Sequence, residues 1–197
     1  STHRDVYGEA LAEYFEKEEL SSPLLLHSTY GDIEEMPLEV FFRDSEDFPE
    51  LEFIALSLCD GKVLDVGAGV GAHALYLQEK KFDVTALEIS QTACNIMQQR
   101  GVQKIVQQDF FDLADQQYDT LLFLMNGIGL AGSLDGFREL LAHSKKLLSE
   151  KGQLLFDSSD ISYLYDEYRI QRPEYYFGEI GYQYEFNGIK GEPFKWL

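Results

Sequence analysis

The sequence predicts an α/β fold in which helices cover both faces of a doubly wound, mostly parallel sheet, an αβα sandwich. Two observations carry this prediction. Strand-like apolar runs alternate with helical stretches, and one of these runs is apolar almost throughout. The chain has 197 residues and 45% hydrophobic content, which suits one well-packed domain and is short for two. We therefore expect a single domain over residues 1–197 with its core at 61–160.

The alternation of strands and helices runs from residue 62 to residue 159. The expected strands are 62–68, 82–90, 104–111, 118–127 and 151–159, and the expected helices are 71–81, 91–101 and 133–149. Ser90 and Gly101 are placed to cap the second helix at its start and its end. The apolar run 121–125 is typical of a central strand covered on both faces. In such sheets ligands bind at the carboxyl ends of the strands, so we look for chemistry there.

The segments on either side of this core have a different pattern. Residues 1–60 show a helical spacing of apolar side chains at 5–20 and a further expected helix at 47–58, so the segment is predicted to be a helical lid. Residues 161–197 are rich in tyrosine, and the pair Asn187–Gly188 predicts an antiparallel hairpin.

The composition disfavours several classes of partner. The 35 acidic and 16 basic residues give a net charge of −19, and no segment concentrates Lys or Arg, which phosphate backbones require. Nucleic acids and anionic membranes are therefore disfavoured, and the acidity is interpreted as serving solubility. Cys59 and Cys94 form no CxxC, and no stretch has the length of a membrane span. We expect packing thiols, no metal site and a cytoplasmic protein, and leave the oligomeric state open.

Residues 63–72 read VLDVGAGVGA, a glycine-rich turn after a buried strand. Such a turn can hold a dinucleotide, S-adenosylmethionine (SAM) or no ligand at all. Asp65 is unusual because a carboxylate inside an apolar strand costs free energy unless it is paired. We interpret Asp65 as fixing the glycine loop and facing a positive group of a ligand. The alternative is that it accepts backbone N–H groups within the turn.

Three more strand ends carry polar residues. Glu88, 21 positions after Gly67, can accept both hydrogen bonds of a ribose diol. Asp109 and Phe110 can contact the edge and face of an adenine, or they can cap a helix and fill the core. Asn126 follows the fourth strand, where it can orient a substrate or complete a turn.

Together the motifs LDVGAGVG, LEIS, DF and YDTLLFLMN resemble, in order and spacing, the class I SAM-dependent methyltransferases over roughly residues 45–160. The resemblance implies a Rossmann-like sheet, SAM as cofactor, S-adenosylhomocysteine as product and methyl transfer to a small-molecule acceptor. It also implies that the glycine loop holds the methionine moiety, that the acid of LEIS binds the ribose and that the DF pair holds the adenine. The implied cofactor-binding residues are Asp65, Gly67, Ala68, Gly69, Gly71, Glu88, Ile89, Asp109, Phe110, Asn126 and Gly127.

Other functions are less well supported by the residues. The stretch 67–72 fits the dinucleotide pattern G-x-G-x-x-A, but Asp65 within the strand and the pair at 109–110 have no role in that scheme. A SAM-fold enzyme such as an aminopropyl transferase would need further acids near residue 126, and none is present. A non-catalytic SAM-binding protein stays open as an alternative.

The acceptor side is expected to come from segments outside the core. Tyr7, Tyr30 and Arg43 are the substrate-side candidates, and Arg43 can pair either with the cofactor's carboxylate or in a surface salt bridge. His73 is the nearest candidate for a general base, but a histidine on a helix face is the plainer reading, so we assign no catalytic residue.

The end of the chain departs from the pattern that the resemblance implies. Members normally finish with a further helix and an antiparallel strand pair, whereas this sequence stops at Leu197 after the expected hairpin. We expect either that the chain is cut short or that the hairpin substitutes for those strands.

Overall fold

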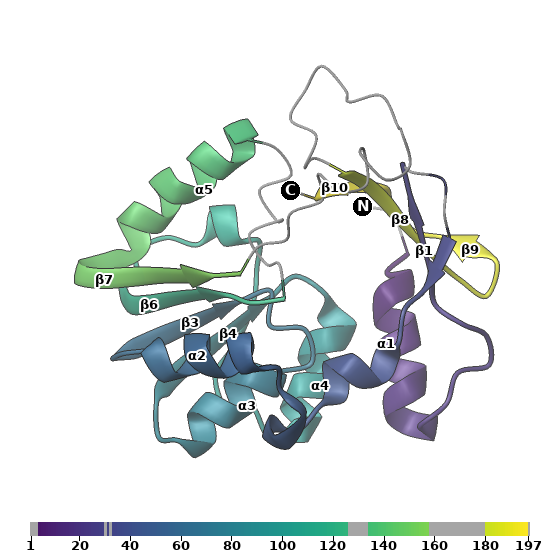
Figure 1. Ribbon diagram of the computed structural model, residues 1–197, viewed down its shortest axis with the longest axis horizontal. Helices are drawn as coiled ribbons and strands as arrows, with labels where there is room; N and C mark the ends of the chain where they lie inside the picture. Colours follow the sequence, from purple (N-terminus) through teal and green to yellow (C-terminus); the bar gives the residue numbers. More distant parts are fainter. Residues whose placement is uncertain (1–3, 30, 32, 126–133, 158–179, 197) are drawn as a thin grey trace.

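The computed structural model describes residues 4–29, 31, 33–125, 134–157 and 180–196. Two sheets organise them (Figure 1). The middle of the chain forms a five-stranded parallel sheet, on the left in Figure 1, and segments from both ends of the chain form a five-stranded antiparallel sheet on the right.

The parallel sheet has the strand order β5-β4-β3-β6-β7. Its strands are β3 (Lys62–Val66), β4 (Asp83–Glu88), β5 (Ile105–Gln107), β6 (Tyr118–Phe123) and β7 (Leu148–Phe156). All neighbouring pairs are parallel, and the strand order changes direction between β3 and β6. This confirms the predicted doubly wound sheet. Ligands of such sheets bind beside this change in order, at the carboxyl ends of the strands.

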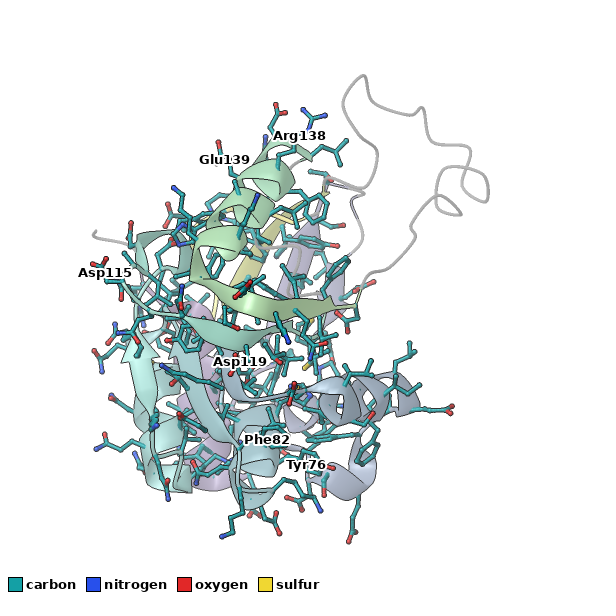
Figure 2. The ribbon with its side chains drawn as sticks, turned by 90° about the vertical axis from the view of Figure 1, so that its left-hand side faces the viewer. Tyr76, Phe82, Asp115, Asp119, Arg138 and Glu139 are labelled. Atoms are coloured by element: carbon teal, nitrogen blue, oxygen red, sulfur yellow. The ribbon has the colours of Figure 1, made fainter. Side chains whose placement is uncertain are left out.

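Helices cover both faces of the parallel sheet, as predicted. They are α2 (Glu50–Leu58), α3 (Ala72–Glu79), α4 (Gln91–Arg100) and α5 (Leu134–Leu147). Along β3, Val63 packs with α2, α3 and α4, whereas Leu64 packs with α5. Figure 2 shows the two layers, with Arg138 of α5 above the sheet and Tyr76 of α3 below it. Because both faces of β3 are covered, its neighbouring residues Val63 and Leu64 are both apolar.

Most boundaries of these elements follow local signals. The Ser90 hydroxyl accepts a hydrogen bond from the Ala93 N–H at 3.2 Å, and Gly101 ends the helix with φ = 100°, so both predicted caps of α4 are confirmed. Strand β6 ends earlier than predicted, at Phe123. Two residues later Met125 has a left-handed backbone conformation (φ = 57°), which is incompatible with a β-strand.

The antiparallel sheet has the order β10-β8-β1-β2, with β9 paired to β8. Its strands are β1 (Leu25–Ser28), β2 (Ile33–Glu35), β8 (Ile180–Phe186), β9 (Ile189–Lys190) and β10 (Phe194–Trp196). The turn between β8 and β9 lies at Asn187 and Gly188, which have φ of 53° and 74°, so the predicted hairpin is confirmed.

Two features of this sheet differ from the sequence-based expectation. The N-terminal segment predicted as a helical lid contains the α-helices α1 (Val6–Lys17) and α2, but it also contributes the strands β1 and β2. The hairpin does not extend the parallel sheet, because β8 pairs with β1, and among the described strands β7 stays at the edge of the parallel sheet. Four-residue strands such as β1 carry too little periodicity to be predicted.

A third core cluster joins the antiparallel sheet to the parallel half. Leu11 of α1 packs with Phe186 of β8, with Val70 of the glycine loop and with Ile96 of α4. Helix α1 therefore holds the antiparallel sheet beside the carboxyl ends of the parallel strands (Figure 1). Within the part of the chain that is described, no helix combines the length and apolar character needed to cross a membrane.

Candidate functional site

The glycine loop after β3 has the conformation that its glycines allow. Gly67, Gly69 and Gly71 have φ of 70°, 59° and 88°, where other residues are strained. The N–H groups of Gly67 and Ala68 both donate to the Leu87 carbonyl, at 2.9 and 3.0 Å, which fastens the loop to β4. A Cβ at Gly67 would meet no atom within 4 Å, whereas one at Gly71 would lie 2.8 Å from Val102. Gly71 therefore allows close packing, and Gly67 borders open space.

Asp65 lies at the end of β3 with only 2% of its surface exposed. Its Oδ2 atom is buried and has no hydrogen-bond partner in the described structure. Burial raises the pKa of Asp65 to about 6; the neighbouring His73 opposes this shift and the charge of Glu88 adds to it. An unpaired buried carboxylate oxygen is costly in a native structure and calls for a partner, for which a cationic group is chemically suited.

Glu88 ends β4 and braces the glycine loop. Its Oε1 accepts a hydrogen bond from the Gly69 N–H and its Oε2 accepts one from the Ser90 N–H, both at 2.9 Å. Burial raises the pKa of Glu88, and these backbone hydrogen bonds oppose that shift. A carboxylate oxygen accepts more than one hydrogen bond, so Glu88 keeps acceptor capacity for hydroxyl groups. The adjacent Ile89 is exposed.

The residues after β5 lie as a helix cap followed by a core aromatic. Asp109 Oδ1 accepts a hydrogen bond from the Phe111 N–H at 2.9 Å and caps the turn η3 (Phe110–Asp112). Phe110 is only 2% exposed and packs against Phe123 and His143, whereas the Phe111 ring beside it is partly exposed. This geometry is the plainer of the two readings of the pair, and contact with an adenine stays a prediction for both residues.

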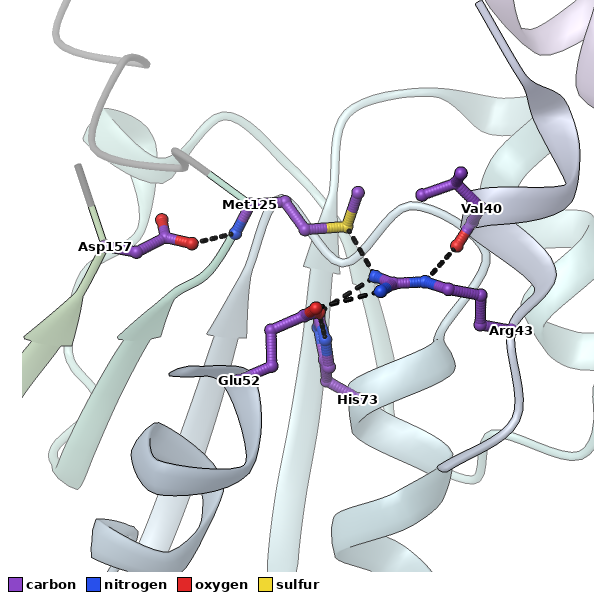
Figure 3. Close-up of polar contacts among 6 residues, drawn as sticks. All are labelled: Val40, Arg43, Glu52, His73, Met125 and Asp157. Atoms are coloured by element: carbon purple, nitrogen blue, oxygen red, sulfur yellow. Dashed lines mark hydrogen bonds and ion pairs between the residues drawn. The ribbon is translucent and has the colours of Figure 1, made fainter. Parts of the chain in front are cut away.

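A buried ionic cluster adjoins the loop, and its central residue was missed by the sequence analysis. Glu52 on α2 accepts hydrogen bonds from both Nη atoms of Arg43, each at 2.9 Å, and its Oε1 lies 2.5 Å from His73 Nε2 (Figure 3). Burial alone would raise the pKa of Glu52, but the hydrogen bonds from His73 and Arg43 hold it below its ordinary value. Glu52 is 5% exposed. The only sequence signal was an acid within the apolar stretch LEFIALSL.

This cluster corrects two of the expected alternatives. The salt bridge of Arg43 is largely buried rather than at the surface. His73, in the first turn of α3, is a buried partner of a carboxylate rather than a plain histidine on a helix face.

The end of β6 meets this cluster. Met125 Sδ lies 3.5 Å from Nη2 of Arg43, and the Met125 N–H donates to Asp157 Oδ2 at 3.0 Å (Figure 3). Arg43 therefore lies beside the end of β6, one of the two neighbouring strands between which the strand order changes direction. Asn126 and Gly127, two of the implied cofactor-binding residues, and the substrate-side candidate Tyr30 lie outside the described residues.

Tyr7, predicted on the substrate side, lies over the glycine loop. Its ring stacks on Tyr184 with centroids 5.3 Å apart, and its hydroxyl would be 3.8 Å from a Cβ placed on Gly69. Burial and the charge of Glu88 raise the pKa of Tyr7 well above its ordinary value. Tyr7 thus connects the antiparallel sheet to the loop.

Comparison with known proteins agrees with this geometry. Residues 63–152 match the family described as "Methyltransferase domain". A crystal structure of a SAM-dependent methyltransferase from Bacteroides fragilis, solved with S-adenosyl-L-homocysteine, is 37% identical and superposes with a TM-score of 0.88. That match covers 98% of this chain and 80% of the other.

Two more distant relatives show less. The putative methyltransferase YqeM from Bacillus subtilis (strain 168) is 28% identical over 103 residues, which are 49% of this chain and 42% of that protein. The match therefore spans less than half of YqeM. The CcbJ methyltransferase from Streptomyces caelestis is 15% identical and superposes with a TM-score of 0.61. The match covers 97% of this chain and 80% of the CcbJ chain, and it shows a shared fold.

The Bacteroides fragilis match spans nearly the whole of this chain, and it agrees with the motifs, the strand order and the family match. The chain belongs to the class I SAM-dependent methyltransferases, the family whose cofactor is SAM, as the sequence predicted.

Proposed function

We propose that this protein binds SAM at the carboxyl ends of β3 and β4 and transfers its methyl group to a small-molecule acceptor. The observation that carries the proposal is the buried, unpartnered Oδ2 of Asp65 beside the open space at Gly67. A buried carboxylate without a partner is stabilised by a cationic ligand, and SAM carries an ammonium and a sulfonium.

The other polar groups of the site match the remaining parts of SAM. Glu88 has acceptor capacity for the ribose hydroxyls, and Arg43 is a cation suited to the cofactor's carboxylate. Ala68, Gly69 and the exposed Ile89 complete the proposed cofactor site, with Tyr7 over the loop. Asp65 thus complements the positive charge of the cofactor, Arg43 its carboxylate and Glu88 its ribose hydroxyls.

When bound, SAM supplies a methyl group that an acceptor takes by in-line displacement. The protein's part is then placement and exclusion of water, which can supply much of the rate. We assign no catalytic base, because the Nε2 of His73, the nearest candidate, is engaged by Glu52. The net charge of −19 supports a small molecule over a nucleic acid as acceptor.

Isothermal titration calorimetry tests the cofactor. We expect SAM and S-adenosylhomocysteine to bind with dissociation constants on the order of micromolar, and NAD to release no heat, since two carboxylates oppose a pyrophosphate. Binding of NAD alone would contradict the proposal.

A variant pair locates the site. Glu88→Ala should weaken SAM binding by about tenfold or more, because it removes a charged acceptor of hydroxyl groups. Glu185→Ala on the antiparallel sheet, which removes a carboxylate bonded to His27, is the matched control and should leave affinity unchanged.

A screen with methyl-labelled SAM over small amines, alcohols and phenols then identifies the acceptor. Binding of SAM without methyl transfer to any compound would favour the non-catalytic alternative.

A further inference from the structure

We infer that Glu52 is a positioning residue that holds the Arg43 guanidinium in place to receive the carboxylate of the bound cofactor. This inference rests on the proposed function and adds a residue to it. Glu52 acts through Arg43 and needs no contact with the cofactor itself.

The first step of the argument is that one buried carboxylate holds two separate side chains. Glu52 binds both Nη atoms of Arg43 in the two-point geometry that a guanidinium and a carboxylate prefer. The same carboxylate binds His73 Nε2. Because all three side chains are largely removed from water, each depends on the others for its polar partners.

The second step is where these three residues come from. Arg43 directly follows η1 (Leu38–Phe42), Glu52 lies on α2, and His73 lies in the first turn of α3, directly behind the glycine loop. Glu52 thus ties the N-terminal segment to α3, the helix that follows the glycine loop (Figure 3).

The third step is a count of donors on Arg43. Its Nε–H donates to the Val40 carbonyl at 2.6 Å, and one N–H from each Nη donates to Glu52. Each Nη therefore keeps one further N–H. Among the described residues, the contact recorded for these is the Met125 sulfur, 3.5 Å from Nη2, and a thioether is a weak acceptor. A ligand carboxylate can replace that sulfur without breaking the pair with Glu52.

The fourth step separates positioning from mere packing. A free arginine side chain samples many rotamers, and fixing it costs conformational entropy whenever a ligand binds. Glu52 and Val40 hold Arg43 in one orientation before binding. Loss of Glu52 should therefore weaken only those ligands that use Arg43, namely ligands with a carboxylate.

The experiment compares two ligands of the same site by calorimetry. S-adenosylhomocysteine carries the carboxylate, and 5′-methylthioadenosine lacks the whole amino-acid part. For Glu52→Gln we expect S-adenosylhomocysteine to bind about tenfold to a hundredfold more weakly, since a charge-assisted contact loses its orientation. The affinity for 5′-methylthioadenosine should stay within about twofold of the wild type. Glu185→Gln, in the other Glu–His pair, should change neither affinity.

Each other result overturns the inference. An equal loss for both ligands would assign Glu52 a structural role, and no loss for either would show that Arg43 needs no positioning. If Glu52→Gln does not fold, as judged by circular dichroism, Arg43→Lys replaces it, because lysine keeps the charge and loses the two-point contact; the same ligand-selective loss is expected. Failure of the wild type to bind either ligand would instead overturn the proposed function, and with it this inference.

Discussion

The two sheets of this protein are assembled from the chain in opposite ways. In the parallel sheet, all strands come from the one continuous stretch between Lys62 and Phe156, and helices α3, α4 and α5 join most of them in succession. In the antiparallel sheet, β1 pairs with β8, and Leu25 lies opposite Glu185. The first arrangement needs mostly local contacts, and the second closes a loop of most of the chain at an entropic cost.

The two halves also differ in what they bury. Every polar or charged side chain that is buried among the described residues lies between Glu52 and Ser144, in the parallel half. The antiparallel half contributes aromatic packing, with Tyr184 stacked on Tyr7 and Phe194 beside Tyr182. The parallel half therefore carries the chemistry of the candidate site, whereas the antiparallel half covers it.

The largest effect on stability is expected in the core of the parallel half. Leu122→Ala removes a side chain with no exposed surface and should lower the free energy of unfolding by about 2–5 kcal/mol. Denaturation in guanidinium chloride measures it. Leu141→Ala on α5, where the side chain is 42% exposed, is the control and should cost less than about 1 kcal/mol. If both variants lowered the free energy of unfolding by a similar amount, the buried side chains of the parallel sheet would not be the main source of stability.

A smaller and opposite effect is expected at the buried carboxylate of β3. The pKa of Asp65 is about 6 in the folded protein, compared with 3.8 for an aspartate in the unfolded chain. Ionisation of Asp65 at neutral pH therefore costs more free energy in the folded state than in the unfolded state. This cost is absent below about pH 4 and complete above about pH 6, so the unliganded protein loses stability as the pH rises through this window. Asp65→Asn should therefore be more stable than wild type at pH 7.5 by about 2–3 kcal/mol, and no more stable at pH 3.5.

Thermal unfolding at both pH values checks this prediction. Asp119→Asn is the control of opposite sign. Hydrogen bonds from the Lys62 N–H and the Ser149 hydroxyl lower the pKa of Asp119, so its loss should reduce stability at neutral pH. A gap between wild type and Asp65→Asn that does not change with pH would show that the fold leaves the pKa of Asp65 at its unfolded value.

The smallest effect is expected where the two halves meet. A double-mutant cycle with Tyr7→Leu and Tyr184→Leu should give a coupling free energy of about 0.5–1.5 kcal/mol, because the two rings stack. The pair Tyr7→Leu and Tyr118→Leu, with Tyr118 packed on Lys62 in the parallel sheet, should be additive. Additivity in the first cycle would mean that the antiparallel sheet does not depend on α1 through this stack.

The parallel sheet and its helices could be predicted from the sequence, including the caps of α4. In the antiparallel sheet, the Asn187–Gly188 turn could also be predicted. Their signals are local: apolar periodicity, a capping hydroxyl and glycines with positive φ. The pairing of β1 with β8 could not be predicted. Four residues, Leu-Leu-His-Ser, say nothing about a partner more than 150 positions away.

The residues of the candidate site also fall into those that local sequence signals predict and those that depend on tertiary contacts. Two features of the site follow from the sequence alone: carboxylates end β3 and β4, and a glycine loop lies between β3 and α3. Strand ends and turns depend on consecutive residues, so they can be predicted. The contacts by which Glu52 joins Arg43 to His73 and Tyr7 covers Gly69 are seen only in the folded protein. Those contacts link side chains of different elements, and their geometry exists only once the elements have packed against one another.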